Sequence, residues 1–279
     1  MEYRLTRRIG GRGLARHQFH EALRGVAIDG DRVCAVGDSV LKVFDAEGTL
    51  LGQWATGFPG ECVAVDGESR VWVGERQQVE VFHPTRGLVD TWRDPERLGR
   101  VTAIGFGKAG ELFLADATAR CIRRYDAKRR LLNDIGERHR KGGFDIPNGV
   151  VDFAVDGEGV VHVANPGMHR VERYTAEGAL LGHFGRFDGR DPSGFGGCCN
   201  PTNVTVDARG RVIVSEKAAP RVKLYDPSGE LLTVVADTAF DVGARNMDLA
   251  VDGAGRIYAV DTATLQICVF SPAAPEAAA

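Results

Sequence analysis

The sequence predicts an all-β fold, a six-bladed β-propeller in which each blade is a four-stranded antiparallel sheet. Three observations predict it: short apolar-alternating runs between Gly and Asp turns, six recurrences of one such unit, and a spare N-terminal run that matches a gap at the C-terminal end. Alternating runs with tight turns are typical of antiparallel meanders. A recurring unit of this size is typical of propeller blades.

The unit is clearest between Asn203 and Val235. Turn signals around Gly210 and Gly229 separate its runs, and Pro220 ends one of them because proline cannot donate within a central strand. The four predicted strands are Asn203–Asp207, Arg211–Ser215, Arg221–Tyr225 and Leu231–Val235.

Six copies of the first half of this unit align on one turn, and an aromatic-ended strand follows each copy. The copies are Ala27–Val36, Ala64–Val73, Gly105–Ala115, Ala154–Ala164, Thr205–Ser215 and Ala250–Val260. The predicted blades are Arg24–Trp54, Cys62–Trp92, Thr102–Ile135, Asp152–Phe184, Asn203–Val235 and a sixth that begins at Asp248. The longest connections, Gly136–Val151 and Gly185–Thr202, lead into inner strands, and long loops on a rigid scaffold often carry function.

The sixth copy stops after its third strand, at Phe270, and Tyr3–Ile9 is a strand with no partner near it in sequence. We expect Tyr3–Ile9 to complete the last blade and close the ring, which removes exposed sheet edges. One domain then uses residues 1–279, with 272–279 as a disordered tail.

The composition excludes few functions, but it indicates the cellular compartment. The formal charge of −3 gives no general attraction to nucleic acid or to an anionic membrane. No apolar run is long enough to span a bilayer, and the charged N-terminus lacks the apolar core of a signal peptide. We therefore expect a cytoplasmic protein, in which the six cysteines are thiols or metal ligands rather than structural disulfides.

The repeated core D-x-x-G-r-(I/V)-x-V, followed by r-V-x-x-(Y/F)-D-x-x-G-x-L, resembles the NHL-repeat family of six-bladed propellers. The resemblance covers nearly the whole chain. It implies the fold, and either a binding scaffold or an enzyme, because propellers serve as both. The strings CCNPTN and SEKAAPRVKLYD resemble a bacterial subgroup of this family.

The chemically unusual residues are the neighbouring Cys198 and Cys199. A disulfide between adjacent residues closes a strained ring, so the pair is expected to remain as thiols. With Cys62 they form a candidate site for Zn, Cu or Fe, and His169, His20 or His83 is a candidate fourth ligand. The alternative is that one cysteine packs as a small apolar residue and the protein holds no metal.

Two sets of repeat positions should face one end of the central channel. Where inner strands begin, the polar members are Asp152, Asn203 and Asp248. Where second strands end, the residues are Asp38, Glu75, Asp116, Asn165, Glu216 and Asp261; these are expected mainly to cap turns or to bond backbone amides of the neighbouring blade. Asn200 and Lys217 complete the candidate surface for another protein or a small ligand, which is the function that we favour from the sequence.

An alternative function comes from a second resemblance, to the gluconolactonase/regucalcin family of six-bladed propellers. The segment Ile146–Gly149 is similar to that family's PNG segment, which implies Asn148, Glu61 and Asp248 as ligands of Ca or Mg in a divalent-metal-dependent hydrolase. Such an ion could polarise a lactone carbonyl.

A further alternative is an RNA-binding NHL propeller. Its basis is a basic run that includes Arg123, Arg124, Arg129 and Arg130 and continues through residues 138–141. Arg and Lys also guard exposed strand edges, and the net charge is negative, so nucleic acid is the less favoured partner.

Overall fold

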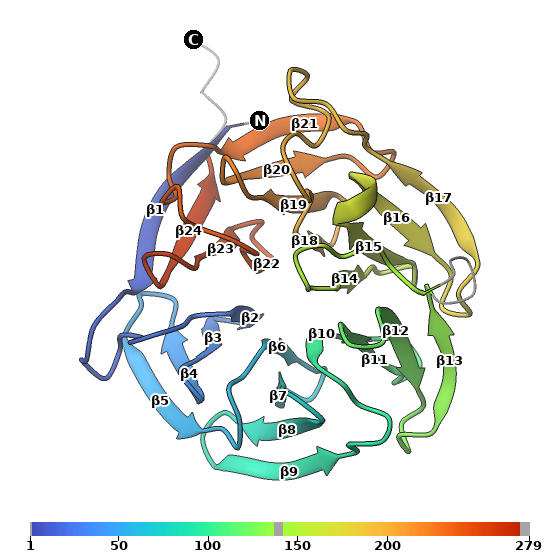
Figure 1. Ribbon diagram of the computed structural model, residues 1–279. Coiled ribbons are helices and arrows are strands. Elements are labelled where there is room, and N and C mark those ends of the chain that lie inside the picture. Colours follow the sequence, from blue (N-terminus) through green and yellow to red (C-terminus); the bar gives the residue numbers. More distant parts are fainter. Residues whose placement is uncertain (1, 137–141, 274–279) are drawn as a thin grey trace.

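The computed structural model describes residues 2–136 and 142–273. They form six four-stranded antiparallel sheets arranged around a central axis, as Figure 1 shows. The all-β six-bladed propeller predicted from the sequence is therefore confirmed. None of the described residues forms a helix long and apolar enough to span a membrane.

The first three blades follow the chain from the innermost strand outward. Their strands are β2 (Gly25–Asp29), β3 (Arg32–Gly37), β4 (Val40–Asp45) and β5 (Leu50–Ala55); β6 (Cys62–Val65), β7 (Val71–Gly74), β8 (Gln78–His83) and β9 (Gly87–Arg93); and β10 (Val101–Phe106), β11 (Leu112–Asp116), β12 (Cys121–Tyr125) and β13 (Leu131–Ile135).

The next two blades repeat this order, and the sixth takes its outer strand from the N-terminus. The strands are β14 (Asp152–Val155), β15 (Val161–Asn165), β16 (Arg170–Tyr174) and β17 (Leu180–Phe184); β18 (Asn203–Val206), β19 (Val212–Glu216), β20 (Arg221–Tyr225) and β21 (Leu231–Ala236); and β22 (Leu249–Val251), β23 (Ile257–Asp261), β24 (Gln266–Pro272) and β1 (Tyr3–Gly10).

Ring closure occurs where the sequence predicted it. Strand β1 pairs antiparallel with β24, from Tyr3 opposite Pro272 to Gly10 opposite Gln266. In Figure 1 the blue first strand lies beside the red last one. Pro272 belongs to β24, and the amide of Ala273 donates to the carbonyl of Glu2 over 2.8 Å, so the predicted tail does not begin at 272. Residues 274–279 of that predicted tail lie outside the described residues.

The hydrophobic core is divided among the interfaces between neighbouring blades. Each of six buried clusters draws its side chains from two adjacent sheets. The aromatic residue near the end of each third strand is fully buried there: Phe44, Phe82, Tyr125, Tyr174, Tyr225 and Phe270. The recurrence of an aromatic in the sequence thus reflects one packing position used six times, as expected when large apolar side chains dominate burial.

The first testable prediction concerns closure. Ile9 on β1 is 1% exposed and packs in the cluster between the last and first blades. Ile9→Ala should lower the free energy of unfolding by about 2–5 kcal/mol, the range for truncating a buried aliphatic side chain. Leu5→Ala on the same strand is the matched control, because Leu5 is 39% exposed, and it should cost less than about 1 kcal/mol. Equal losses in denaturant unfolding would show that β1 does not seal the ring.

Candidate functional site

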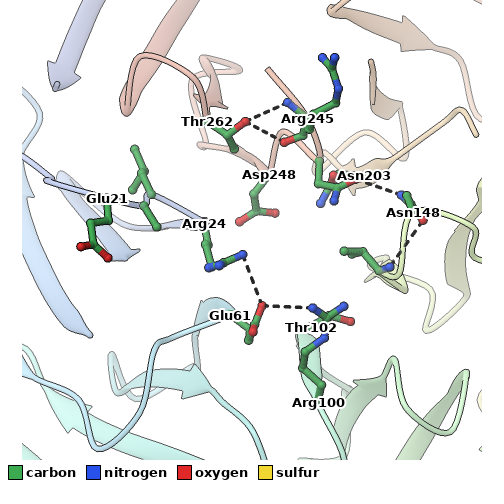
Figure 2. Close-up of a pocket in the computed structure, with 14 residues that line it drawn as sticks. Glu21, Arg24, Glu61, Arg100, Thr102, Asn148, Asn203, Arg245, Asp248 and Thr262 are labelled. Atoms are coloured by element: carbon green, nitrogen blue, oxygen red, sulfur yellow. Dashed lines mark hydrogen bonds and ion pairs between the residues drawn. The ribbon is translucent and has the colours of Figure 1, made fainter. Parts of the chain in front are cut away.

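The principal cavity lies at the end of the central channel where the inner strands begin. It has a volume of about 270 Å³, and all six blades contribute to its wall. Figure 2 shows the side chains of Arg24, Glu61, Asp248 and Asn148 around a common space, whereas the Arg245 side chain points away from it. The lining residues are Glu21, Ala22, Leu23, Arg24, Glu61, Arg100, Thr102, Asn148, Val150, Asn203, Arg245, Asn246, Asp248 and Thr262. A second cavity, of about 240 Å³, runs along the inner strands and shares Thr102 and Asp248 with the first.

A series of contacts between neighbouring blades fixes the wall of this channel. The Cys62 thiol donates to the Val101 carbonyl at 3.5 Å, and the Thr102 hydroxyl donates to the Val151 carbonyl at 2.7 Å. Further round the ring, the Ser215 hydroxyl, on the second strand β19, donates to the Met247 carbonyl at 2.8 Å. Side chains of the two innermost strands therefore join neighbouring blades.

Two carboxylates continue this series. The amide of Val204 donates to Asp152 at 2.7 Å, and the amide of Val26 donates to Asp248 at 2.8 Å. Between the first and second blades the corresponding residue is Gly25. A Cβ atom there would lie 3.0 Å from the Val63 nitrogen, so the close approach of the two backbones favours glycine.

The two carboxyl groups also perturb each other. Burial raises the pKa of Asp248 to about 7, against the lowering effect of the Val26 amide. Burial, and next the charge of Asp248, raises the pKa of Asp152 well above its usual value. Two nearby carboxyls removed from water favour sharing a proton over ionising together. The bottom of the cavity therefore holds a proton near neutral pH.

Two arginines face one carboxylate across the cavity. Nη1 of Arg24 lies 3.7 Å from Oε2 of Glu61, and Nη1 of Arg100 lies 3.9 Å from the same oxygen. Both distances exceed the span of an N–H···O hydrogen bond, roughly 2.7–3.2 Å. The two contacts are therefore ion pairs without a hydrogen bond. The negative charge of Glu61 lies near the positive charges of Arg24 and Arg100.

Amide side chains supply the opposite wall. Nδ2 of Asn148 donates to Oδ1 of Asn246 at 3.0 Å. Asn203 is only 4% exposed, and its Oδ1 atom has no hydrogen-bond partner among the described residues. A buried polar atom without a partner costs free energy, so this oxygen is a candidate ligand-binding atom.

The structure brings together some of the predicted site residues and separates others. Glu61, Asn148, Asn203 and Asp248 line the principal cavity, and Cys62 and Asp152 line the adjoining channel. The cysteine pair, Asn200, Lys217, Glu216 and His169 line neither cavity. Within the described part of the chain, no three His, Cys, Asp or Glu side chains are grouped so that they could hold a metal ion. A transition metal on Cys198, Cys199 and Cys62 stays a prediction.

The residues outside the cavity have structural partners. Asn200 is buried and both ends of its amide bond backbone groups, at Gly196 and Lys217. Glu216 is buried in ion pairs with Arg221 and, at 2.6 Å, with Lys223. His169 packs edge-to-face on Phe187.

At four of the six second-strand ends the carboxylates bond backbone amides, but these amides do not belong to the neighbouring blade as expected. Asp38, Glu75, Asp116 and Asp261 accept backbone amides from the loop that leads into the inner strand of their own blade. Glu216 departs from this pattern because its partners are the two basic side chains named above.

The basic run is paired with acids. Arg123 pairs with Asp116 and Asp134, and Arg124 pairs with Glu111 and Glu177. Arg129 and Arg130 pair with Asp90 and Asp126, respectively. The basic residues at 138–141 lie outside the described residues.

Sequence reasoning missed Arg24, Arg100, Arg245, Asn246 and Thr262. A signal was available for Arg24, which directly precedes the first residue of an inner strand, as Glu61 does in the next repeat. Aligning the residue that precedes each inner strand across the repeats would have placed the side chains of Arg24 and Glu61 side by side. Arg100 also directly precedes its inner strand, β10, but a register shift between Val101 and Ala103 moves it away from the aligned repeat position. Arg245 and Asn246 come from a loop, where repeat alignment gives no register.

Comparisons with known proteins support the fold and no specific family. No protein-family model matches the sequence, and no curated protein matches it. Solved structures do match. A Bacteroides thetaiotaomicron protein of unknown function has a TM-score of 0.72 at 16% identity, over 94% of this chain and 72% of that one.

Two other propellers are similar. Virginiamycin B lyase from Staphylococcus aureus has a TM-score of 0.63 at 11% identity, over 98% of this chain and 100% of that one. The WD40 propeller domain of Doa1 has a TM-score of 0.63 at 12% identity, over 90% and 79%. At these identities the likeness defines the class of the protein, a β-propeller, and does not extend to activity.

The second testable prediction uses the proton at the bottom of the cavity. The folded-state pKa of Asp248 is raised to about 7. Its contribution to stability is therefore complete below the unfolded pKa, roughly 4, and is lost as pH rises through about 7. Asp248→Asn keeps an acceptor for Val26 and cannot ionise. Relative to the parent, it should gain about 1–3 kcal/mol of stability between pH 5 and pH 8 in urea unfolding.

The control for this experiment is Asp45→Asn. Asp45 is an exposed turn residue, and the Thr49 amide lowers its pKa, so it is ionised in both folded and unfolded chains at pH 5 and pH 8. Its stability difference from the parent should not change between these values. A constant difference for Asp248→Asn as well would contradict the raised pKa.

Proposed function

We propose that this protein binds a small carboxylate-bearing ligand at the mouth of its central channel. The single observation that carries the proposal is the convergence of Arg24 and Arg100 on one oxygen of Glu61 inside a 270 Å³ cavity. The Arg100 guanidinium also donates to the carbonyl of Gly149. The N–H groups of both arginines that face Glu61 are not used in short hydrogen bonds. Hydrogen bonds between guanidinium and carboxylate are among the stronger ones in proteins.

The surroundings suit a ligand of this kind. Asn148 and Asn246 provide side-chain amides in the same cavity, and these can fix the orientation of a polar ligand. Burial raises the pKa of both Asp152 and Asp248, which limits negative charge at the bottom of the cavity, so an incoming anion meets less repulsion there.

Isothermal titration with a panel of small hydroxycarboxylates, each paired with its neutral amide, tests the proposal. The acids should bind at least about tenfold more tightly than their amides, a difference of about 1.4 kcal/mol. Arg24→Gln should remove that preference. Arg130→Gln, at an outer turn and paired with Asp126, is the control and should leave it unchanged. Equal binding of acids and amides, or no binding in the panel, would refute the proposal.

A second candidate function is a divalent-metal-dependent hydrolase. Glu61, Asn148 and Asp248, which the resemblance to the gluconolactonase family implied as ligands, come from three different blades and line one cavity. Asn203 adds an oxygen without a partner. Oxygen donors of this type suit Ca or Mg, and such an ion would supply Lewis-acid polarisation of a lactone or ester carbonyl.

Two features of the chain would have to change for an ion to bind. Glu61 would turn from the two arginines, and Asp248 would lose its proton. Metal affinity should therefore increase as pH rises through about 7, because the ligand must be deprotonated.

Calcium and magnesium titrations at pH 6 and pH 8 check this candidate without an activity assay. Glu61→Gln and Asn203→Leu should each weaken binding by at least about tenfold, the usual scale for removing a contribution of 1.4 kcal/mol. Thr262→Val, in the same cavity, should not. Binding that is absent, or that is insensitive to both ligand substitutions, would exclude the oxygen site.

A further inference from the structure

The neighbouring cysteines lie in the loop between β17 and β18, outside the channel cavities. Their sulfur atoms are 2.6 Å apart, only about 0.6 Å longer than an S–S bond of ~2.0 Å. Cys199 has a left-handed backbone, with φ of +66°, and the two side chains point to the same side instead of alternating as they would in a strand. Both cysteines are free thiols, and their sulfur atoms are in contact.

The turn is held rigid on both sides of the pair. After the pair in sequence, the side-chain amide of Asn200 donates to the carbonyls of Gly196 at 2.7 Å and Lys217 at 2.8 Å. The side-chain oxygen of Asn200 accepts the backbone amide of Lys217 at 2.8 Å. Before the pair in sequence, Phe195 is fully buried, and the buried Lys223 ammonium donates to the Gly194 carbonyl at 2.6 Å. The sulfurs are therefore brought together by the fold, so little entropy remains to be lost on joining them.

Cys198 differs from the other cysteines in access. It is exposed, whereas Cys199 is buried in the turn and Cys34, Cys62, Cys121 and Cys268 are buried in strands. Burial raises the pKa of Cys34 to about 12 and that of Cys268 to about 11, which keeps both as unreactive thiols. Among the described cysteines, only Cys198 and Cys199 have another thiol in contact.

We propose that Cys198 and Cys199 form a reversible dithiol–disulfide site that reacts with small-molecule disulfides. The exposed Cys198 thiolate attacks one sulfur of the oxidant RSSR, forming a mixed disulfide and releasing RS⁻. The Cys199 thiolate then attacks the Cys198 sulfur and releases the second RS⁻. The two protons from the cysteines go to the two leaving thiolates, so the balance is one protein disulfide and two RSH.

The product should be easily reduced. Neighbouring Cα atoms are about 3.8 Å apart across a trans peptide, below the usual disulfide span of roughly 4.4–6.8 Å. Disulfides that are strained or exposed are the labile ones, whereas structural disulfides resist reduction. The pair is thus suited to cycling and not to stabilising the fold.

Oxidised glutathione added to the native full chain tests the proposal. Trypsin cleavage after Arg190 and Arg209 yields a peptide that contains both cysteines and no other. The mass of that peptide, measured by mass spectrometry, should fall by two hydrogens. Treatment with dithiothreitol should restore the original mass. Cys199→Ser should stop at a glutathione adduct on Cys198. Cys34→Ala, which keeps the pair, should behave as the parent does.

A second measurement is the binding of an arsenical to the reduced parent protein. Phenylarsine oxide, which binds paired thiols, should bind in one equivalent to the reduced protein and prevent the loss of hydrogens. A stable glutathione adduct in the parent, or oxidation of buried cysteines before the pair, would overturn the proposal. So would binding of the arsenical that survives Cys198→Ser.

Discussion

The structure depends on closing a ring of sheets. A propeller blade packs its faces against two neighbours, so each of the six clusters needs both partners. Pairing of β1 with β24 satisfies the last of these interfaces and joins the two ends of the chain in one sheet. Because closure removes the free edges, the inner strands can surround a channel without exposing an unpaired backbone.

Closure also determines where polar groups can lie. Residues at or next to the start of four inner strands contact the next blade, and the protein uses a thiol, a hydroxyl or a carboxylate there. Asp152 and Asp248 both serve this structural purpose. Since the ring places them close together away from water, the same contacts that join the blades leave a proton at the bottom of the cavity. Structural bonding and candidate ligand chemistry thus share the same residues.

The cysteine turn and the channel cavity are separate features, and one blade contributes to both. The loop before β18 is anchored through Asn200 and Lys223, and strand β18 begins with Asn203 at the cavity. The two proposals therefore stand on different atoms. Carboxylate binding rests on Arg24, Arg100 and Glu61, and thiol exchange rests on two sulfurs that do not line the cavity.

The sequence by itself determined the strands, the six repeats and the closing strand, because side-chain alternation and turn residues are local signals that recur. It also indicated Asn203 and Asp248, since residues leading into inner strands must gather at one end of a ring, and the resemblance to the gluconolactonase family implied Glu61 and Asn148. Only the tertiary structure decided that Arg24 and Arg100 flank Glu61, that Cys62 lies in the channel apart from the cysteine pair, and that Glu216 is held by Lys223. These contacts depend on loop paths and on packing between blades, and neither has a period that can be read along the chain.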